Sequence, residues 1–217
     1  MSSITYSQLK EQCNTGDILL FNTQYKWYDF IIEKFSKSKF SHVGVILKSP
    51  AYLDEKLKVG IYLLESGKEE FTDSINNEFI YGVQVVDLDK VVEGFVSTSS
   101  QTKIKIGNLF YRKLNCERNK DFLNVCRDSI KKVYDCPYDL LPQDWIKSEL
   151  HNYNGNKTQR LNTFWCSALA CYLYVQLGYL DKNTPWTLIQ PTQFSFYEGK
   201  QLKLNDNINL EPEVFVI

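Results

Sequence analysis

Residues 41–66 read SHVGVILKSPAYLDEKLKVGIYLLES, two apolar segments on either side of a polar loop. The first segment, SHVGVIL (41–47), is rich in β-branched residues and is closed by Pro50. The second segment, GIYLLES (60–66), ends just before Gly67. Because the loop has hairpin length and no helical pattern, the two segments are predicted to be neighbouring antiparallel strands.

The rest of the chain predicts further strands followed by helices. Strands are expected at GDILLF (16–21), YGVQVVDL (81–88) and NLFYRKL (108–114), with a loop between the last two. Helices are expected at 5–13, 24–35, 119–134 and 164–177, a loop at 151–163, and strand-like pieces in 190–217. No strong helical pattern lies between residues 41 and 114, whereas a parallel sheet needs helices between its strands. We therefore predict one α+β domain over 1–217, with helices packed on an antiparallel sheet or partial barrel.

The composition excludes several classes of protein. With 217 residues, 43% of them hydrophobic, and a net charge of −1, the chain can bury a core and has no general electrostatic reason to bind nucleic acid. The longest apolar stretch, 164–175, is too short to span a bilayer, and the N-terminus lacks a secretion pattern. We expect a cytoplasmic protein without a transmembrane anchor, whose six cysteines are thiols. With two histidines and no CxxC pair, no metal site is expected.

Cys166 is the first candidate for chemistry. The apolar helix at 164–177 can be capped by Asn162 or Thr163, which places Cys166 in its first turn. The unpaired N–H groups and the helix dipole there favour the thiolate, the nucleophilic form of cysteine. Cys171 lies deeper in the helix and is expected to be a core thiol. The alternative for Cys166 is the same, because free cysteines are usually buried.

His42 is the candidate base. It interrupts an apolar strand, where an unpaired imidazole would cost free energy on burial. Gly44 shares its face of the strand and leaves an empty place where another element could approach. His151, in a polar Asn-rich stretch, is expected to be a solvated loop residue. The alternative for His42 is a core histidine with its hydrogen bonds satisfied.

Glu65 is the candidate third member, because a catalytic histidine needs a group that fixes its tautomer and stabilises its charged form. It ends the hydrophobic strand at 60–66, an unusual setting for a surface carboxylate. If strands 41–47 and 60–66 pair as a hairpin, Glu65 and His42 face the same way. The alternative is an ordinary charge at a strand end.

Six sequence blocks in chain order resemble the circularly permuted branch of the NlpC/P60 superfamily of papain-like thiol enzymes, and most closely its YiiX-like subgroup. The blocks are GDILLF (16–21), SHVGVIL (41–47), LLES (63–66), CPYD (136–139), WCSALACYLYVQLG (165–178) and PTQFSF (191–196). The ordinary NlpC/P60 order begins with the cysteine helix, whereas here the strands come first. The resemblance implies a permuted papain-like fold over roughly residues 14–197.

The resemblance also implies roles for individual residues. Cys166 matches the nucleophile, His42 the base, and Glu65 the polar third member of the triad. Tyr138 matches a tyrosine that lies near the active site, where it contacts substrate, supports the oxyanion or simply packs. Trp165, beside the nucleophile, could line a substrate groove with Tyr138, although tryptophan and tyrosine are more often core residues.

The function expected from these residues is a cysteine hydrolase of the peptidase or amidase type. It would cleave an amide or ester through a thioester and need no metal or organic cofactor. The substrate would be a peptide or an acyl- or lipid-linked compound. One alternative is acyl transfer to an amine or hydroxyl, including a lipid-directed acyltransferase or lipase. Such lipid enzymes carry a second histidine as the third member of the triad and an NCEHF-type cysteine block, and neither appears here. In the subgroup that the chain resembles, an acidic and a β-branched residue often follow the CS pair, whereas this chain has Ala168-Leu169-Ala170 there. The other alternative is a catalytically silent binding or structural module.

Overall fold

The computed structural model describes residues 2–23, 39–67, 71–99, 102–105, 107–139, 159–198, 201–205 and 207–217. The helix predicted at 24–35, the greater part of the loop predicted at 151–163, and His151 lie outside the described residues.

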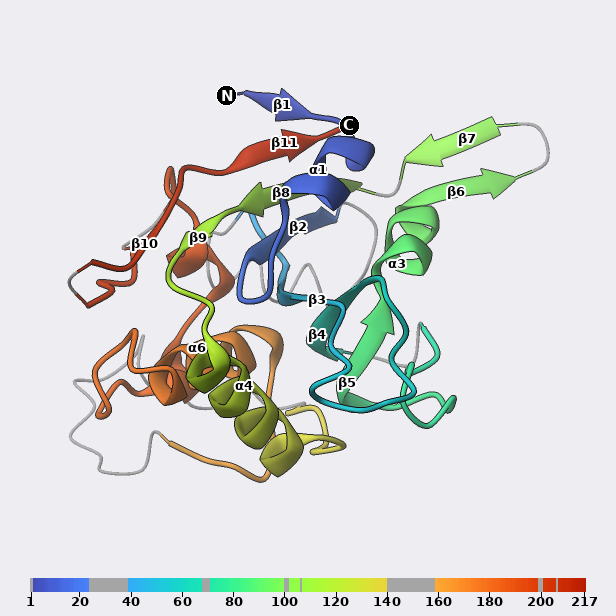
Figure 1. Ribbon diagram of the computed structural model, residues 1–217. Coiled ribbons are helices and arrows are strands. Elements are labelled where there is room, and N and C mark those ends of the chain that lie inside the picture. Colours follow the sequence, from blue (N-terminus) through green and yellow to red (C-terminus); the bar gives the residue numbers. More distant parts are fainter. Residues whose placement is uncertain are drawn as a thin grey trace.

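A seven-stranded sheet organises the described chain, and its strand order is β1-β11-β8-β2-β3-β4-β5 (Figure 1). The bounds are β1 (Ser3–Ile4), β2 (Ile18–Thr23), β3 (His42–Lys48), β4 (Ile61–Gly67), β5 (Gly82–Asp87), β8 (Gly107–Arg112) and β11 (Val214–Val216). The strands β2, β3, β4, β5 and β8 confirm the five strands predicted from the sequence.

The sheet is mixed, which corrects the expectation of an antiparallel sheet. Strand β1 runs parallel to β11, whereas each of the other neighbouring pairs is antiparallel. The parallel pair joins the beginning of the chain to its end, so no short turn constrains the relative direction of its strands. The α+β class itself is confirmed.

In the part of the chain that the structure describes, four α-helices and two 3₁₀ helices accompany the sheet. They are α1 (Tyr6–Gln12), α3 (Leu88–Phe95), α4 (Lys120–Val133), α6 (Cys166–Gln176), η1 (Trp186–Leu188) and η2 (Pro191–Phe194). Thr5 and Gln8 form a capping box at α1, and the Asn119 side chain accepts a hydrogen bond from Phe122 N at the start of α4. Helices α1, α4 and α6 correspond to predicted helices.

The loop predicted between the strands at 81–88 and 108–114 is wrong. Residues 88–95 form α3, and a hairpin follows whose strands are β6 (Val96–Ser99) and β7 (Thr102–Lys105) (Figure 1). Leu88 and Val91 are buried on one side of α3, but the helix has only eight residues. A helical pattern of only eight residues, directly after a valine-rich strand, is easily missed in the sequence. A second two-stranded sheet pairs β9 (Leu114–Asn115) with β10 (Asn209–Leu210).

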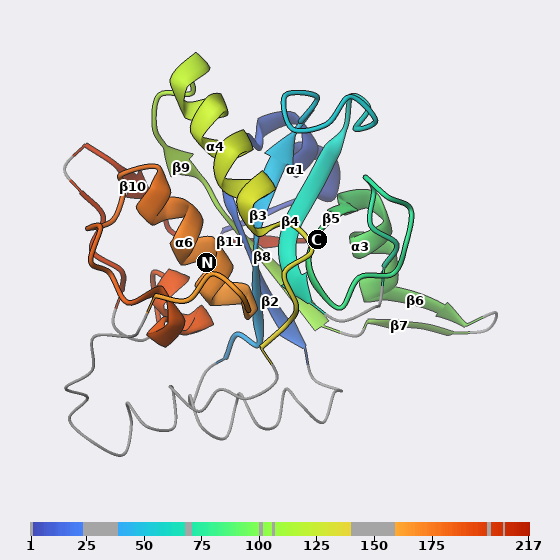
Figure 2. The ribbon, with the colours of Figure 1, turned by 90° about the horizontal axis from the view of Figure 1, so that it is seen from below.

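Helices cover both faces of the sheet (Figure 2). The larger core joins Leu20, Val43 and Leu64 to residues of α4 and α6, and the smaller core joins Leu19 and Leu63 to residues of α1 and α3. Because both faces are buried, successive residues of a strand enter different cores. This explains the continuous apolar runs of β2 and β4, which lack the alternation typical of a sheet with one solvated face.

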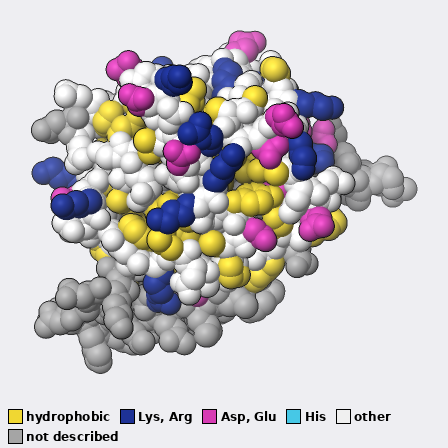
Figure 3. Space-filling model, turned by 60° about the horizontal axis from the view of Figure 1, so that its bottom comes forward, with side chains coloured by type: hydrophobic (Ala, Val, Ile, Leu, Met, Phe, Trp, Pro, Cys, Tyr) yellow, Lys and Arg dark blue, Asp and Glu magenta, His cyan; other side chains and the backbone are white. Residues whose placement is uncertain are grey.

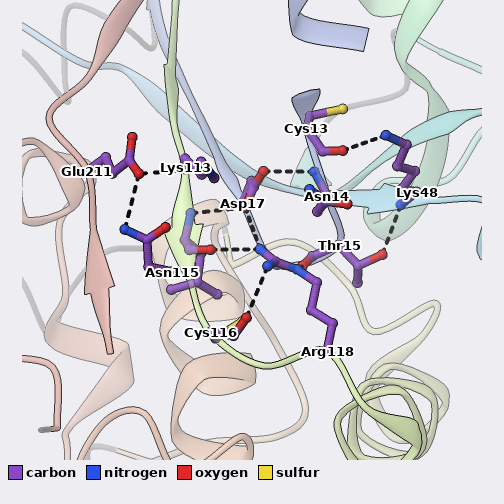
Figure 4. A network of polar contacts seen from close by, with 12 residues as sticks. Cys13, Asn14, Thr15, Asp17, Lys48, Lys113, Asn115, Cys116, Arg118 and Glu211 are labelled. Carbon is purple, nitrogen blue, oxygen red and sulfur yellow. Dashed lines mark hydrogen bonds and ion pairs between the residues drawn. The ribbon is translucent and has the colours of Figure 1, made fainter. Parts of the chain in front are cut away.

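Asp17, which precedes β2, is a fully buried carboxylate that ties several segments together (Figure 4). Its Oδ1 accepts hydrogen bonds from Leu114 N at 2.9 Å and Arg118 Nη2 at 2.7 Å. Its Oδ2 accepts bonds from Asn14 N at 2.8 Å and the Tyr111 hydroxyl at 2.6 Å. The aspartate of the GDILLF block is therefore structural: it fixes the start of β2 against the chain that follows β8.

A second buried ionic group holds the segment after η2. The Arg112 guanidinium donates hydrogen bonds to the carbonyl oxygens of Phe194, Leu210 and Glu211. The fully buried Glu213 carboxylate accepts a bond from the Ser195 hydroxyl at 2.6 Å and lies 3.9 Å from Arg112 Nε. The PTQFSF block is thus held through Phe194 and Ser195, which bind Arg112 at the end of β8 and Glu213 just before β11.

Charged side chains of both signs are interspersed with apolar ones on the face shown in Figure 3. Among the helices that the structure describes, none has the length and apolar character needed to cross a bilayer.

The Asp17–Arg118 ion pair is expected to contribute strongly to stability. Arg118→Met leaves the buried carboxylate without its cation, which should lower the free energy of unfolding by about 3–5 kcal/mol. The matched control is Arg127→Met, because the Arg127–Asp128 pair is solvent-exposed and should contribute about 0.2–1 kcal/mol. Urea denaturation of both variants measures the difference, and equal losses would contradict the structural role given to Asp17.

Candidate active site

His42 and Glu65 form a short hydrogen bond between neighbouring strands. His42 is the first residue of β3, and Glu65 lies near the end of β4. The antiparallel register, in which Val45 pairs with Leu64, puts Glu65 on the same face as His42. His42 Nε2 lies 2.7 Å from Glu65 Oε2. The hairpin predicted from the sequence therefore does bring these two side chains together.

Burial makes this contact significant. The Glu65 carboxylate is 9% exposed and the His42 imidazole 23% exposed, so the bond is largely shielded from water. The ring of Phe21, on the paired strand β2, packs edge-on against the imidazole at 5.1 Å. Because Nε2 is committed to Glu65, the ring nitrogen left for another partner is Nδ1.

Cys166 is the first residue of α6, as expected, but the helix begins later than predicted. Trp165 is its N-cap, and neither Asn162 nor Thr163 caps it. Thr163 instead donates its hydroxyl to Asp139 Oδ2 at 3.2 Å. The Trp165 side chain makes no capping hydrogen bond, so it does not compete for the N–H groups of the first turn.

Cys166 interacts with His42, although the two residues belong to elements far apart in the sequence. Burial of the imidazole disfavours its charged form, but the charge and hydrogen bond of Cys166, and then those of Glu65, outweigh this effect. Together they raise the pKa of His42 to about 10. The structure thus places one imidazole in contact with a thiol and a carboxylate, the three side chains singled out in the sequence.

The start of α6 is anchored by residues that the sequence analysis did not single out. The hydroxyl of Ser66, which is fully buried next to Glu65 on β4, donates to Phe164 O at 2.6 Å. Phe164 N in turn donates to Pro137 O at 3.1 Å. Ser66 is a small polar residue at the end of an apolar strand, and that pattern was the available signal.

Gln84 is a second residue missed by the sequence analysis. It pairs with Glu65 across β4 and β5, and its Nε2 donates to Glu65 Oε1 at 3.1 Å. A lone amide inside the apolar strand at 81–88 was the signal.

The place beside His42 that Gly44 was expected to leave empty is filled. A Cβ at Gly44 would lie only 2.6–3.0 Å from the side-chain carbons of Leu63, so this leucine occupies the space. The glycine thus admits a side chain of the neighbouring strand β4, which is the kind of close approach that its lack of a side chain was expected to allow.

Tyr138 and Trp165 lie close to the anchored helix start. Tyr138 is half-buried, forms a bridge with Phe164, and packs its ring 5.6 Å from that of Tyr81. Trp165 is 3% exposed and belongs to the larger core. A substrate contact for either residue stays a prediction.

The six cysteines are all free thiols, and they occupy different environments. Burial raises the pKa of Cys171, which lies in α6 and belongs to the larger core. Burial also raises the pKa of Cys13 to about 11 and that of Cys126 to about 12. Burial of these thiols disfavours the reactive thiolate, whereas Cys166 has an imidazole beside it.

Comparison with models of known protein families finds no match, and comparison with curated proteins finds no relative. Within the described chain, no three His, Cys, Asp or Glu side chains are grouped so that they could hold a metal ion.

The His42 titration is a direct test of the site. Its pKa of about 10 lies above the ordinary 6.5, so the folded state holds the proton more tightly than the unfolded chain. This stabilisation is fully present below pH 6.5 and is lost as the pH rises through about 10. NMR of imidazole nitrogens should show the high pKa, with His151→Gln used to assign the signals. Cys166→Ala should lower the His42 pKa more than Glu65→Gln, and a wild-type value near 6.5 would contradict the geometry.

Proposed function

We propose that this protein is a cysteine-dependent hydrolase that cleaves an amide or ester bond through a thioester on Cys166. The observation that carries the proposal is the position of His42, whose Nε2 binds Glu65 while the ring also interacts with Cys166. A carboxylate on one side of an imidazole and a thiol on the other is the arrangement that activates a cysteine nucleophile.

In the first step the Cys166 thiolate attacks the carbonyl carbon of the substrate. The carbonyl oxygen becomes an oxyanion, and backbone N–H groups at the uncapped start of α6 are suited to stabilise it. His42, protonated at Nδ1, gives this proton to the leaving amine or alkoxide. The carbon–nitrogen or carbon–oxygen bond breaks, and an acyl-thioester remains on Cys166.

In the second step a water molecule attacks the thioester. His42 accepts one proton from the water, and the carboxylic acid leaves as the sulfur–carbon bond breaks. Cys166 returns to its starting state with the imidazolium beside it. Throughout both steps Glu65 keeps Nε2–H oriented and stabilises the positive charge on the ring.

We also propose that the chain is a circularly permuted, papain-like member of the NlpC/P60 superfamily. Support comes from the order of the site residues, with the histidine and glutamate strands before the cysteine helix. Further support comes from α6 packing on β3 and β4, the strands that carry His42 and Glu65. The CPYD block also lies beside the helix start, where Pro137 O accepts a hydrogen bond from Phe164 N.

Alkylation mapped cysteine by cysteine with mass spectrometry tests the nucleophile. Iodoacetamide should modify Cys166 at least about tenfold faster than Cys171 at neutral pH, because burial disfavours the Cys171 thiolate. Replacing His42 by Gln should lower the Cys166 rate and turnover by roughly 10²–10⁴-fold. Cys171→Ala is the matched control in the same helix and should leave both unchanged. Equal labelling of Cys166 and Cys171 would contradict the assignment.

The substrate class follows from a second experiment on wild type and Cys166→Ala. Peptide, isopeptide and lipid-ester libraries are supplied with and without amine or hydroxyl acceptors. Free acid as the product supports hydrolysis, whereas an acylated acceptor would replace it with acyl transfer. A Cys166 that reacts with no electrophile across the pH range would favour the catalytically silent module.

A further inference from the structure

Gln84 lies directly behind the His42–Glu65 pair. It occupies the position of β5 that pairs with Glu65 of β4, and its side chain is fully buried. Glu65 therefore has a different partner for each of its oxygens. Oε2 binds His42 at 2.7 Å, and Oε1 accepts the Gln84 amide at 3.1 Å.

Burying the Gln84 amide costs free energy, so packing alone does not explain why an amide occupies this position. Gln84 Oε1 is buried and has no hydrogen-bond partner among the residues that the structure describes. A buried polar atom without a partner costs roughly 1–3 kcal/mol, whereas an apolar side chain of similar size would avoid this cost. What offsets the cost is the bond from Nε2 to a carboxylate, which is stronger than a bond between neutral groups.

We propose that Gln84 is a positioning residue that orients Glu65 and, through it, His42. The inference rests on the proposed function and adds a fourth member to the site. Because both carboxylate oxygens are held, Glu65 cannot rotate about its last bond without breaking one of the two hydrogen bonds. Its Oε2 therefore stays directed at His42 Nε2, which keeps Nδ1 directed toward Cys166.

The neighbourhood of Glu65 leaves little room for another arrangement. A Cβ added at Gly67 would lie 3.4 Å from the Glu65 carboxylate and 3.7 Å from Gln84 Nε2, so this glycine borders the pair closely. The groups that interact with the His42 charge in the described structure are Cys166 and Glu65. Gln84 is neutral and acts on the imidazole only through the carboxylate.

Two substitutions at Gln84 separate positioning from packing. Gln84→Met keeps the approximate volume and removes the hydrogen bond. It should lower Cys166 alkylation and turnover by roughly 10- to 100-fold, because misplacement of a catalytic group by about 1 Å has effects of this size. Gln84→Glu keeps the shape but sets a second carboxylate against Glu65. Two touching carboxylates share a proton, so the acid limb of the pH–rate profile should move up by about one unit or more.

Val86→Ala is the matched control. Val86 is fully buried two residues along β5, on the same face, and packs in the smaller core without bonding to Glu65. It should lower the melting temperature but leave the pH–rate profile and the imidazole nitrogen signals of His42 unchanged. In Gln84→Met, by contrast, the Nε2 signal of His42 should change because Glu65 has lost its second anchor.

The outcomes distinguish this inference from the proposed function. If wild-type Cys166 is reactive, and Gln84→Met and Gln84→Glu match wild type in rate, pH profile and His42 signals, positioning by Gln84 is overturned while the proposed function stands. If Gln84→Met merely matches Val86→Ala, the residue is structural and the inference also fails. If wild-type Cys166 is unreactive, the proposed function falls, and with it any catalytic purpose for Gln84, whatever the His42 signals show.

Discussion

Two adjacent residues at the end of β4 determine how the candidate site is assembled. Glu65 projects from one face of the strand and binds His42, whereas Ser66 projects from the other face and holds the carbonyl of Phe164 just before α6. The imidazole and the cysteine helix are thus fixed by neighbouring positions of one rigid element. Since side chains alternate across a strand, no loop could impose this relation as firmly. The site depends on that alternation more than on any single contact.

Burial on both faces of the sheet makes such an arrangement demanding. A polar group on a central strand has no access to bulk water, so it must find a partner within the protein. Glu65 meets this demand with His42 and Gln84, and Ser66 meets it with Phe164. Before the start of β2, the buried Asp17 carboxylate likewise accepts hydrogen bonds from four donors. Polar residues in apolar strands therefore mark where the sheet connects to other elements.

This explains which features the sequence could predict. The five predicted strands, and Cys166 at the start of a helix, follow from local patterns, and the hairpin register then brings His42 to Glu65. The features it missed depend on the partner surface. Helix α3 is stabilised by packing, and its eight residues are too few to show a clear helical pattern in the sequence. The parallel pairing of β1 and β11 joins segments more than 200 residues apart, and neither strand indicates its direction. Trp165, an apolar residue, replaces the polar cap that the sequence suggested.

The environments of the thiols show why a helix start alone would not identify a nucleophile. Cys166 is 2% exposed, hardly more than Cys171 in the same helix, so the exposed fraction does not separate the two thiols. What separates them is an imidazole whose charged form is retained to a pH of about 10. A thiolate and an imidazolium stabilise one another, whereas Cys171 has burial as its cause of a raised pKa and no counter-ion to oppose it. The property that distinguishes Cys166 is therefore its charge partner, His42, which Glu65 holds in place from the neighbouring strand β4.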